Sequence, residues 1–571
     1  MEGYTNGRPD VAFWLRQVRL GIEYRKLCAY EEKWGRWRNY YRGLWNPRVQ
    51  PSNLFFKMIR TTVPRIYFRN PSVSITSRRP GLEHHLLAQL LERTDNQLFT
   101  QMGLKKQIKK MVQDNFMFGA GIGKLGFGSQ FQAAPETTTT TQAPLVRGKE
   151  ALEYNILVQP NMPWFLRNAP GCFVIEPGAE DKDAARWDCY VVRRPLADVN
   201  SDPRLKNVGD LGPTEHKSIL RSSYEQMRTP VDMIDLYEIR DRKTGKVFII
   251  TPSLNERTLL FDDDYFFRQG IDVTNTLIFN NDDENFWGIP DAQILEPNQL
   301  EINDIKTVKA LHRRLSLLKI LYKKGTIKQE QLDNMLNGEV GATVEVEGDL
   351  NNSVKPMQAG DVPQALTQAE YEVLQEVRES LGFSRNEFGE FKPGSHSPTA
   401  TEVDNVKAAS EIRVDERRDM IADMLTKVAS DIHPIIFNHW TREQVIDIVG
   451  PYGVPLWITF QPTMLKRGSY VVKVDPDTSV PETKDLRMAK AMKVYEMLKT
   501  NPLIDPILLT KYLLRELHGV SFDDMMPDMA GGMGLTPENP MQLQQAQQLI
   551  PKIQQTVGDR ISQLPLAGRS G

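Results

Sequence analysis

The segment that decides the fold centres on Gly382-Phe-Ser-Arg-Asn-Glu-Phe-Gly-Glu-Phe-Lys-Pro-Gly-Ser-His-Ser-Pro-Thr-Ala-Thr-Glu-Val403, inside a longer stretch from Trp287 to Trp440. Its glycines, prolines and serines predict a loop that leads into a helix. Apolar residues at helical spacing predict long helices on both sides of this loop. Helices this long seldom close into one compact domain, whereas a ring of identical subunits can use them to line a channel.

The first long helix is predicted to begin at residue 291 or 298, depending on Pro297, and to end at residue 323. At 1.5 Å per residue it would span roughly 40 to 50 Å. Its expected apolar stripe consists of Ile305, Val308, Leu311, Leu315 and Leu318. Four cations lie largely off that stripe: Lys306, Lys309, Arg313 and Arg314. A short helix over residues 325–336 and an alternating strand over residues 341–348 are expected next.

Two further helices complete this stretch. The second is predicted over Thr367–Leu381, with most of its glutamates outside the apolar face. The third is predicted to run from Pro398 to about Trp440, with Ser397 as its N-cap. Pro434 is expected to kink it near the end. Its apolar stripe would be Ile421, Met424, Val428, Ile432 and Ile435.

Residues 11–45 are predicted to be helical and are rich in tryptophan, tyrosine and arginine. Basic residues interleaved with aromatic ones can stack on nucleic acid. The alternative, which we favour, is a pair of helices whose rings pack inside while the cations face water. An amphipathic helix over residues 53–68, a strand over Ser72–Thr76 and one or two helices over residues 82–118 are expected to follow.

The run Phe118-Gly-Ala-Gly-Ile-Gly-Lys-Leu-Gly-Phe-Gly128 has the spacing of a dinucleotide-binding fingerprint. That fingerprint follows a strand and opens a helix, whereas this run follows a predicted helix and leads into strand-like sequence. A phosphate-binding P-loop would need glycine in place of Phe118 and a hydroxyl residue in place of Leu125. We therefore predict a helix end that runs into a strand with small residues, and no nucleotide site.

The region from residue 152 to 290 is predicted to be rich in strands, over residues 187–192, 233–240, 247–250 and 259–261. Asp241–Lys246 has the composition of a hairpin turn. Together with the helices, these strands predict an α+β domain. After residue 440 we expect strands over residues 457–460 and 470–474, then two or three helices over residues 482–518. Residues 133–149 and 525–571 are interpreted as a threonine-rich loop and a tail.

The bulk properties exclude several classes of protein. The chain has 571 residues, more than one hydrophobic core usually holds, so three or four subdomains are expected. With 71 basic and 73 acidic residues the net charge is −2, which argues against a conventional DNA-binding protein but not against a conduit through which DNA slides. The sequence suggests neither a secretory signal nor a membrane span. Cys28, Cys172 and Cys189 are interpreted as buried thiols in a reducing compartment.

No constellation of catalytic residues stands out in the sequence. The eight histidines are scattered, and none has the spacing of a zinc-protease motif. The acidic runs Asp262–Asp264 and Asp282–Glu284 lack the spacing of a calcium loop and are interpreted as solvated turns. We therefore expect no catalytic residue, no metal and no cofactor.

Taken in order, the predicted elements resemble those of the portal proteins of tailed bacteriophages, the head-to-tail connectors. The local matches are Trp287-Gly-Ile-Pro290, Ser397-Pro-Thr-Ala-Thr-Glu-Val403 and the helix over residues 53–68 that leads into Arg69-Asn-Pro71. The resemblance covers most of the chain through the order of its elements. The threonine-rich segment and the glutamine-rich tail depart from it.

The resemblance implies an α+β fold with a mixed α/β wing, a long-helix stem, a small β-containing clip, a long kinked tunnel helix and a helical crown. The parts would be a wing (1–290), stem helix 1 (291–323), clip (324–363), stem helix 2 (364–382), tunnel loop (383–399), tunnel helix (400–440), return strands of the wing (441–480), crown (481–524) and flexible tail (525–571).

The function that the resemblance implies is structural, not enzymatic. The chain would form a dodecameric ring at one capsid vertex of the virion, assembled in the host cytoplasm. Double-stranded DNA would pass through its channel during packaging and ejection. Its partners would be further copies of the chain, the major capsid protein, the terminase large subunit and then the head–tail adaptor, with no membrane.

Seven residues are expected to face the DNA: Arg385, Lys392 and His396 in the tunnel loop, and Lys306, Lys309, Arg313 and Arg314 on the first stem helix. The alternative for the stem cations is salt bridging between subunits with Glu372, Glu376 and Glu379. Two other functions stay open at this point. One is a nucleic-acid-handling enzyme that binds through the basic and aromatic N-terminal region, and the other is a different head-completion or scaffold protein.

Overall fold

The computed structural model describes residues 2–67, 70–78, 82–127, 162–202, 205–214, 232–252, 257–315, 319–322, 328, 333, 354–357, 363–382, 400–439, 470–475 and 484–499. The chain divides into two compact units, Met1–Val480 and Pro481–Gly571, and each is described by itself. The described residues of the second unit form one helix, α15 (Lys484–Leu498), which lies within the segment predicted as helical.

The first unit combines helices with antiparallel sheets, so the predicted α+β class is confirmed. Its largest sheet is a meander of five strands that are neighbours in sequence: β6 (Phe173–Ile175), β7 (Trp187–Pro195), β8 (Met233–Asp241), β9 (Lys246–Ile250) and β10 (Thr258–Asp263). The strands predicted between residues 187 and 261 are all present. Asp241 pairs with Lys246 across the predicted hairpin turn.

Helix α1 (Val11–Cys28) covers one face of this sheet. Trp14, Leu15 and Val18 pack against Trp187 and Phe248 of the strands. The hairpin of β1 (Tyr4–Thr5) and β2 (Arg8–Pro9) precedes α1. Helix α2 (Glu31–Arg42) follows α1, and its own tryptophans are also fully buried. The aromatic rings of the N-terminal region therefore pack in the core, as the favoured interpretation predicts.

A second sheet has three strands in the order β11 (Thr274–Leu277), β4 (Gly121–Phe127) and β5 (Pro163–Asn168). The glycine run lies where α5 (Leu104–Phe118) ends and β4 begins, which confirms the predicted helix end and strand. A β-carbon at Gly123 would lie 2.2 Å from the ring of Phe165, and one at Gly126 would lie 2.2 Å from the ring of Trp164. The glycines of β4 thus make room for the aromatic side chains of β5.

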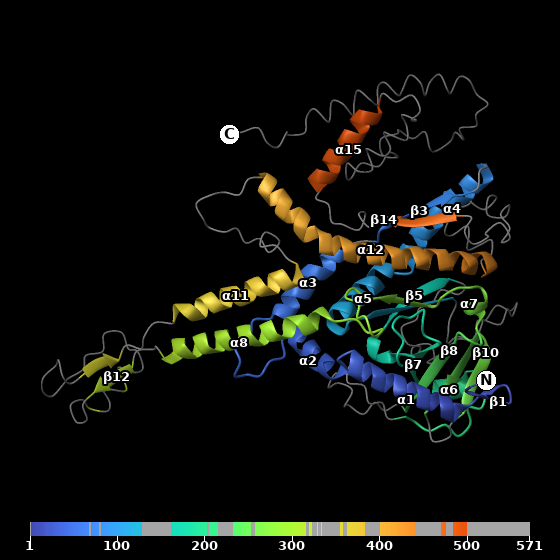
Figure 1. Cartoon of the computed structure of the whole chain (residues 1–571), viewed down its shortest axis with the longest axis horizontal. Helices are drawn as coiled ribbons and strands as arrows, with labels where there is room; N and C mark the ends of the chain where they lie inside the picture. The colour runs from blue at the N-terminus through green and yellow to red at the C-terminus, as the bar shows by residue number, and fades with distance from the viewer. Residues whose placement is uncertain are drawn as a thin grey trace, which may run out of the picture. The chain divides into compact units, whose positions relative to one another are not determined.

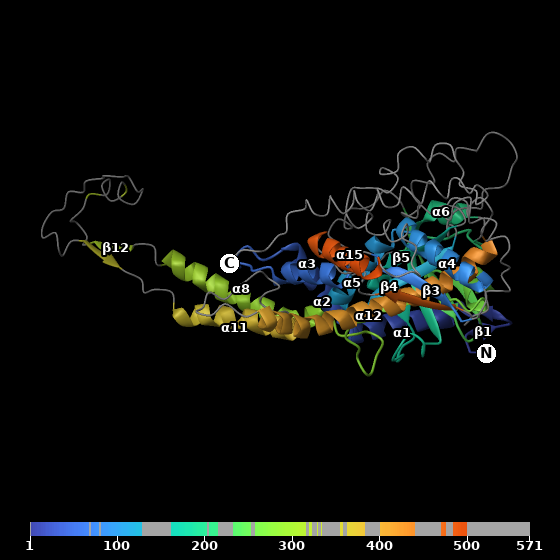
Figure 2. The same ribbon diagram turned by 90° about the horizontal axis from the view of Figure 1, so that it is seen from above.

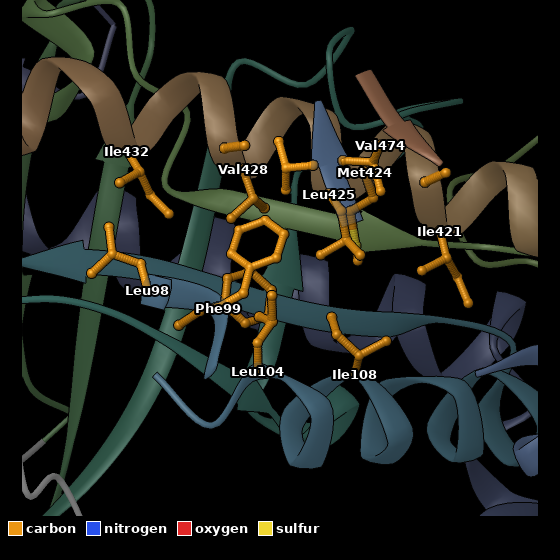
Figure 3. Close-up of a cluster of buried hydrophobic side chains, with 14 of the residues drawn as sticks. Leu98, Phe99, Leu104, Ile108, Ile421, Met424, Leu425, Val428, Ile432 and Val474 are labelled. Carbon is orange, nitrogen blue, oxygen red and sulfur yellow. The ribbon is translucent and has the colours of Figure 1, made fainter. Parts of the chain in front are cut away.

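Helix α12 (Ala400–His439) buries its apolar side in the first unit. Figure 3 shows Leu425, Val428 and Ile432 of α12 facing Leu98 and Phe99 of α4 (Leu82–Gln101), so the predicted stripe of α12 is confirmed. Strand β14 (Tyr470–Asp475) pairs with β3 (Ser72–Ser77), and both contribute to the same cluster. Helix α3 (Leu54–Ile66), with Asn53 as its N-cap, continues past Pro64 for one more turn or less.

Helices α8 (Asp291–Leu315) and α11 (Gln364–Leu381) run side by side away from the sheets (Figures 1 and 2). Strands β12 (Lys319–Tyr322) and β13 (Val354–Met357) pair with each other in the connection between them. The prediction of a helix as far as residue 323 is wrong, because Lys319–Tyr322 pairs with a strand more than thirty residues away. Helices α6 (Leu196–Ser201) and α7 (Tyr265–Arg268) are short.

Several predictions concern residues outside the described part of the chain. They are the helix over 325–336, the strand over 341–348, the N-cap at Ser397, the strand over 457–460, the threonine-rich loop and the tail.

Candidate functional site

Helices α8 and α11 form an antiparallel pair, referred to below as the helix pair. Leu295, Ile302 and Ile305 of α8 belong to one buried cluster with Val373 and Val377 of α11. These side chains are seven and three residues apart on α8 and four apart on α11, so each helix turns one apolar side toward the other. The same cluster includes side chains of α2, α3 and α5, so the helix pair is anchored at its base in the core of the first unit.

Two of the predicted stem cations bind one carboxylate across the helix pair. Lys309 Nζ donates to Glu370 Oε2 at 2.7 Å, and Lys306 Nζ lies 3.7 Å from Glu370 Oε1. The hydrogen bond from Lys309 and the charges of both lysines lower the pKa of Glu370 below its ordinary value. Both lysines are thus engaged within one chain, by a glutamate that the sequence analysis did not select.

The other predicted residues have different surroundings. Arg313 and Arg314 lie in the last turn of α8 and are exposed. The glutamates predicted to bridge subunits are exposed on α11: Glu372, Glu376 and Glu379. The three predicted loop residues lie outside the described part of the chain: Arg385, Lys392 and His396. The outer sides of the helix pair therefore carry opposite charges, cations at the end of α8 and carboxylates along α11.

Helix α8 leaves four large apolar side chains exposed, referred to below as the open stripe. Ile294, Leu300, Val308 and Leu311 are 41%, 44%, 46% and 51% exposed. At 100° per residue they fall within about 120° of the helix circumference. Val308 and Leu311, two members of the predicted apolar stripe, are exposed in the single chain, whereas Ile305 of the same stripe is buried.

The open stripe exists because two other sides of α8 are already covered. One side packs on α11, and a second side lies along the chain that enters α3. There Gln299 accepts a hydrogen bond from Leu54 N at 2.8 Å and donates one to Ser52 O at 2.6 Å. Asn303 Oδ1 accepts from Ser52 N at 2.9 Å. The third side of α8 has apolar residues that the described part of one chain leaves exposed.

Three arginines of α12 hold the ends of three other helices, and the sequence analysis missed them. Arg413 donates to the carbonyls of Glu379 at 3.3 Å and Ser380 at 3.1 Å, at the end of α11. Arg417 binds both carboxylate oxygens of Asp291, the first residue of α8, at 2.8 and 2.9 Å.

The third arginine, Arg418, donates to the carbonyl of Arg65 at 3.1 and 2.8 Å, in the last turn of α3. Cations are favoured at helix C-termini and carboxylates at helix N-termini. Arg413, Arg417 and Arg418, referred to below as the arginine clamp, therefore fix where α12 crosses the base of the helix pair. The spacing of four between Arg413 and Arg417 on a predicted helix was a signal that they share one side.

The motif Trp287-Gly-Ile-Pro290 fixes the start of α8 through close backbone contact. A β-carbon at Gly119, where φ is +83°, would lie 2.0 Å from Gly288 O. Trp287 is 1% exposed, and Asn280 Nδ2 donates to Asp291 Oδ1 at 2.9 Å. The start of α8 is thus locked against the end of α5, which positions the whole helix pair.

The acidic run Asp262–Asp264 has a structural role. Asp264 accepts from Phe266 N at 3.0 Å as the N-cap of α7 and also binds Arg240. Asp263 binds Lys246 and Arg268, so Asp263 and Asp264 are paired with cations, and the interpretation of this run as a solvated turn is wrong for the buried Asp264. Among the described residues no group of three or more histidine, cysteine or acidic side chains is arranged to hold a metal ion. None of the described helices is long and apolar enough to cross a bilayer.

No model of a known protein family matches the chain, and no curated protein is similar to it. What the site can do follows from its geometry alone. A long helix pair with one open apolar side and opposite charges on its outer sides suits association with a further polypeptide. The described part of the helix pair offers no arrangement of nucleophile and base.

Proposed function

We propose that the chain is a portal protein of a tailed bacteriophage, a ring-forming structural protein without enzymatic activity. The ring would sit at one capsid vertex of the virion and carry double-stranded DNA during packaging and ejection. It would contact the major capsid protein, the terminase large subunit and later the head–tail adaptor.

The observation that carries the proposal is the open stripe on α8 together with the acidic outer side of α11. Exposed apolar patches on soluble chains commonly mark contacts with other chains. Beside the open stripe, the cations Arg313 and Arg314 of α8 are complementary in charge to the carboxylates of α11, so the same contact can repeat from each copy to the next. A heterologous contact of this kind generates a ring when its rotation closes.

The order of elements supports the same proposal. A long helix, a connection with a small antiparallel sheet, a second long helix and a forty-residue helix follow one another along the chain. In the proposal these are stem helix 1, clip, stem helix 2 and tunnel helix. The wing corresponds to the two sheets and their covering helices.

The DNA-facing residues of the proposal are Arg385, Lys392 and His396 in the tunnel loop, whereas Arg313 and Arg314 on the stem face the carboxylates of α11 in the next subunit. Lys306 and Lys309 contribute less, because Glu370 already balances part of their charge. A ring multiplies every charge by the number of subunits, so one or two cations per chain suffice for a loose contact with phosphates.

The test is electron microscopy in negative stain with light scattering on the purified chain. We expect rings of about a dozen subunits around a central hole. Replacing Leu300 and Leu311 by Glu should abolish the rings, because carboxylates would then occupy the buried contact. Leu27→Glu is the matched control, because Leu27 is 81% exposed on α1, outside the helix pair.

A wild-type chain that stays monomeric or dimeric at every salt concentration would count against the proposal. Nucleotide-hydrolysis and nuclease assays would then test the alternative of a nucleic-acid-handling enzyme. That alternative is less well supported, since the N-terminal tryptophans that would stack on bases are fully buried: Trp14, Trp34 and Trp37.

A further inference from the structure

A cavity of about 410 Å³ lies between helix α12 and strand β11, away from the helix pair. Its volume falls within the range of about 300 to 1,000 Å³ that is usual for small-molecule sites. Carboxylates line it from two different elements, Asp423 from α12 and Asp181 from the segment between β6 and β7. Its apolar side chains come from β11, the residue after it, and α12: Leu277, Ile278, Met420 and Met424.

Asn275 of β11 offers this cavity an acceptor without a partner. The residue is 3% exposed. Its Nδ2 donates to Val273 O at 3.4 Å, whereas its Oδ1 has no hydrogen-bond partner among the described residues. Residues two apart on a strand share a face, and Leu277 belongs to the same buried cluster as Leu425 of α12. The side chain of Asn275 therefore points toward α12, into the cavity that it lines.

Both lysines that line the cavity are bound by one carboxylate. Lys182 is 6% exposed and binds Asp272, and Lys427 Nζ lies 3.2 Å from the same oxygen of Asp272. These ammonium groups are therefore held in place by the chain itself. A buried acceptor without a donor is costly, and neither lysine relieves that cost at Asn275.

The carboxylates of the cavity are less well balanced than its lysines. Asp183 lies 3.9 Å from Arg242. Asp181 accepts a hydrogen bond from Ala184 N at 2.7 Å, and neither Asp181 nor Asp423 forms an ion pair within the described part of the chain. The polar groups of the cavity that still seek a partner are thus acceptors and negative charges, so a cation that donates hydrogen bonds is the matching ligand.

We propose that the cavity binds a primary aliphatic amine. Its ammonium group, which has three donors and no acceptor, donates to Asn275 Oδ1 and is balanced in charge by Asp181 and Asp423. Its carbon chain packs on Met420 and Met424, because methionine side chains adapt to ligands of irregular shape. Two sources have this chemistry, a free diamine and the lysine side chain of another polypeptide. The inference requires neither a ring nor DNA.

The test measures binding of cadaverine, a linear aliphatic diamine, to the full-length protein by isothermal titration calorimetry. The salt concentration is about 0.15 M, so that pairing with isolated surface carboxylates is screened. Pentanol has the same carbon chain without the charge and should not bind. Acetyl-lysine amide, blocked at its α-amino group, represents the lysine of another chain. Tighter binding of cadaverine assigns the cavity to a free amine, and tighter binding of acetyl-lysine amide assigns it to a polypeptide.

The first variant combines Asp423→Asn and Asp181→Asn, which keep the shape of both side chains and remove their charges. We expect it to bind the amine about tenfold more weakly, because the ammonium group loses its charge-assisted contacts. The control combines Asp304→Asn on α8 and Asp262→Asn on β10, two exposed positions that do not line the cavity. The control should bind like the wild-type chain.

A second variant, Asn275→Leu, removes the unpaired acceptor and nearly preserves the volume of the side chain. It should bind the amine at least about tenfold more weakly. Without ligand it should melt near the wild-type temperature, because the lost oxygen has no partner within the described chain. If this variant unfolds, the charge variant decides alone.

Three results would overturn the proposal. They are the absence of amine binding by the wild-type chain, binding of pentanol as tight as that of the amines, and equal weakening by the charge variant and its control. Asn275 Oδ1 would then be a site for a bound water molecule. None of these results depends on whether rings form, so the amine site and the portal proposal can fail separately.

Discussion

Glu238 lies buried between two cations and joins the two sheets of the first unit. Lys124 Nζ of β4 donates to Glu238 Oε2 at 2.7 Å, and Arg240 Nη2 of β8 donates to Oε1 at 2.8 Å. Burial alone would raise the pKa of Glu238. The charges of Lys124 first and Arg240 second outweigh burial and lower this pKa to about 2.

This pair predicts an acid-dependent loss of stability. Because the folded pKa is depressed, the stabilisation is complete above the ordinary value of 4.5 and is lost as pH falls toward about 2. The difference corresponds to about 3 kcal/mol. Glu238→Gln should lower the free energy of unfolding by about 3 kcal/mol at neutral pH and flatten its pH dependence in that window. Urea unfolding at a series of pH values measures both, with exposed Glu301→Gln as control. An unchanged pH profile would refute this role.

Gly119 gives a second prediction at a single position. Its positive φ and its contact with Gly288 O leave no room for a β-carbon. Gly119→Ala should therefore cost about 3 kcal/mol of unfolding free energy, from backbone strain and forced separation of α5 from α8. Gly209→Ala is the matched control, since nothing lies within 4 Å of a β-carbon there. Equal stabilities in chemical denaturation would show that the two backbones separate without cost.

At the scale of single residues, local properties could be predicted from the sequence, whereas contacts between distant residues could not. The glycine run was predicted correctly as a helix end because that property is local, set by αL geometry and the change of period. The contact of Gly119 with Gly288 joins residues far apart in the chain, and no local pattern encodes it. Lys427 is a second example of a distant contact. Asp423 lies one turn away on the same helix, yet Lys427 Nζ binds Asp272 Oδ2 at 3.2 Å.

At the scale of elements, the arginine clamp predicts how firmly α12 holds α8. Asp291 is 2% exposed, so its carboxylate depends on Arg417 and Asn280. Arg417→Ala should cost about 3 kcal/mol and speed amide exchange in the first turn of α8. Arg417→Lys should restore little of this, because an ammonium group cannot bind both oxygens in the same plane.

The control for the clamp is Arg413→Ala. Arg413 is exposed and binds only carbonyl oxygens, so we expect a loss of about 1 kcal/mol there. Amide exchange in α8 should not change in this variant. Full rescue by Arg417→Lys would show that charge alone, without the paired geometry, anchors α8.

Helices were predicted better than their boundaries and buried sides. Hydrophobic period identifies α8, α11 and α12 because it is a property of each segment alone. The end of α8 at Leu315 depends on pairing of β12 with β13, which are separated by 31 residues between Tyr322 and Val354. The burial of Val308 and Leu311 depends on which neighbours cover α8, and the described helices of one chain pack on other sides of it.

At the scale of the whole molecule, the open stripe and the charges of the helix pair predict a head-to-tail contact between copies. One variant replaces Glu372, Glu376 and Glu379 on α11 by Lys. A second replaces Arg313 and Arg314 on α8 by Glu. Each variant alone should fail to form rings in the microscope, because like charges would meet at every contact.

A mixture of the two variants should assemble again, since each contact then joins opposite charges when the variants alternate. Alternation closes only in a ring with an even number of subunits, so restored rings would also restrict the ring number. Restored dimers without rings would instead indicate a self-complementary contact with twofold symmetry. Normal rings from either variant alone would show that these charged residues do not lie at the subunit contact. Leu300→Glu and Leu311→Glu would then test whether the open stripe forms the contact.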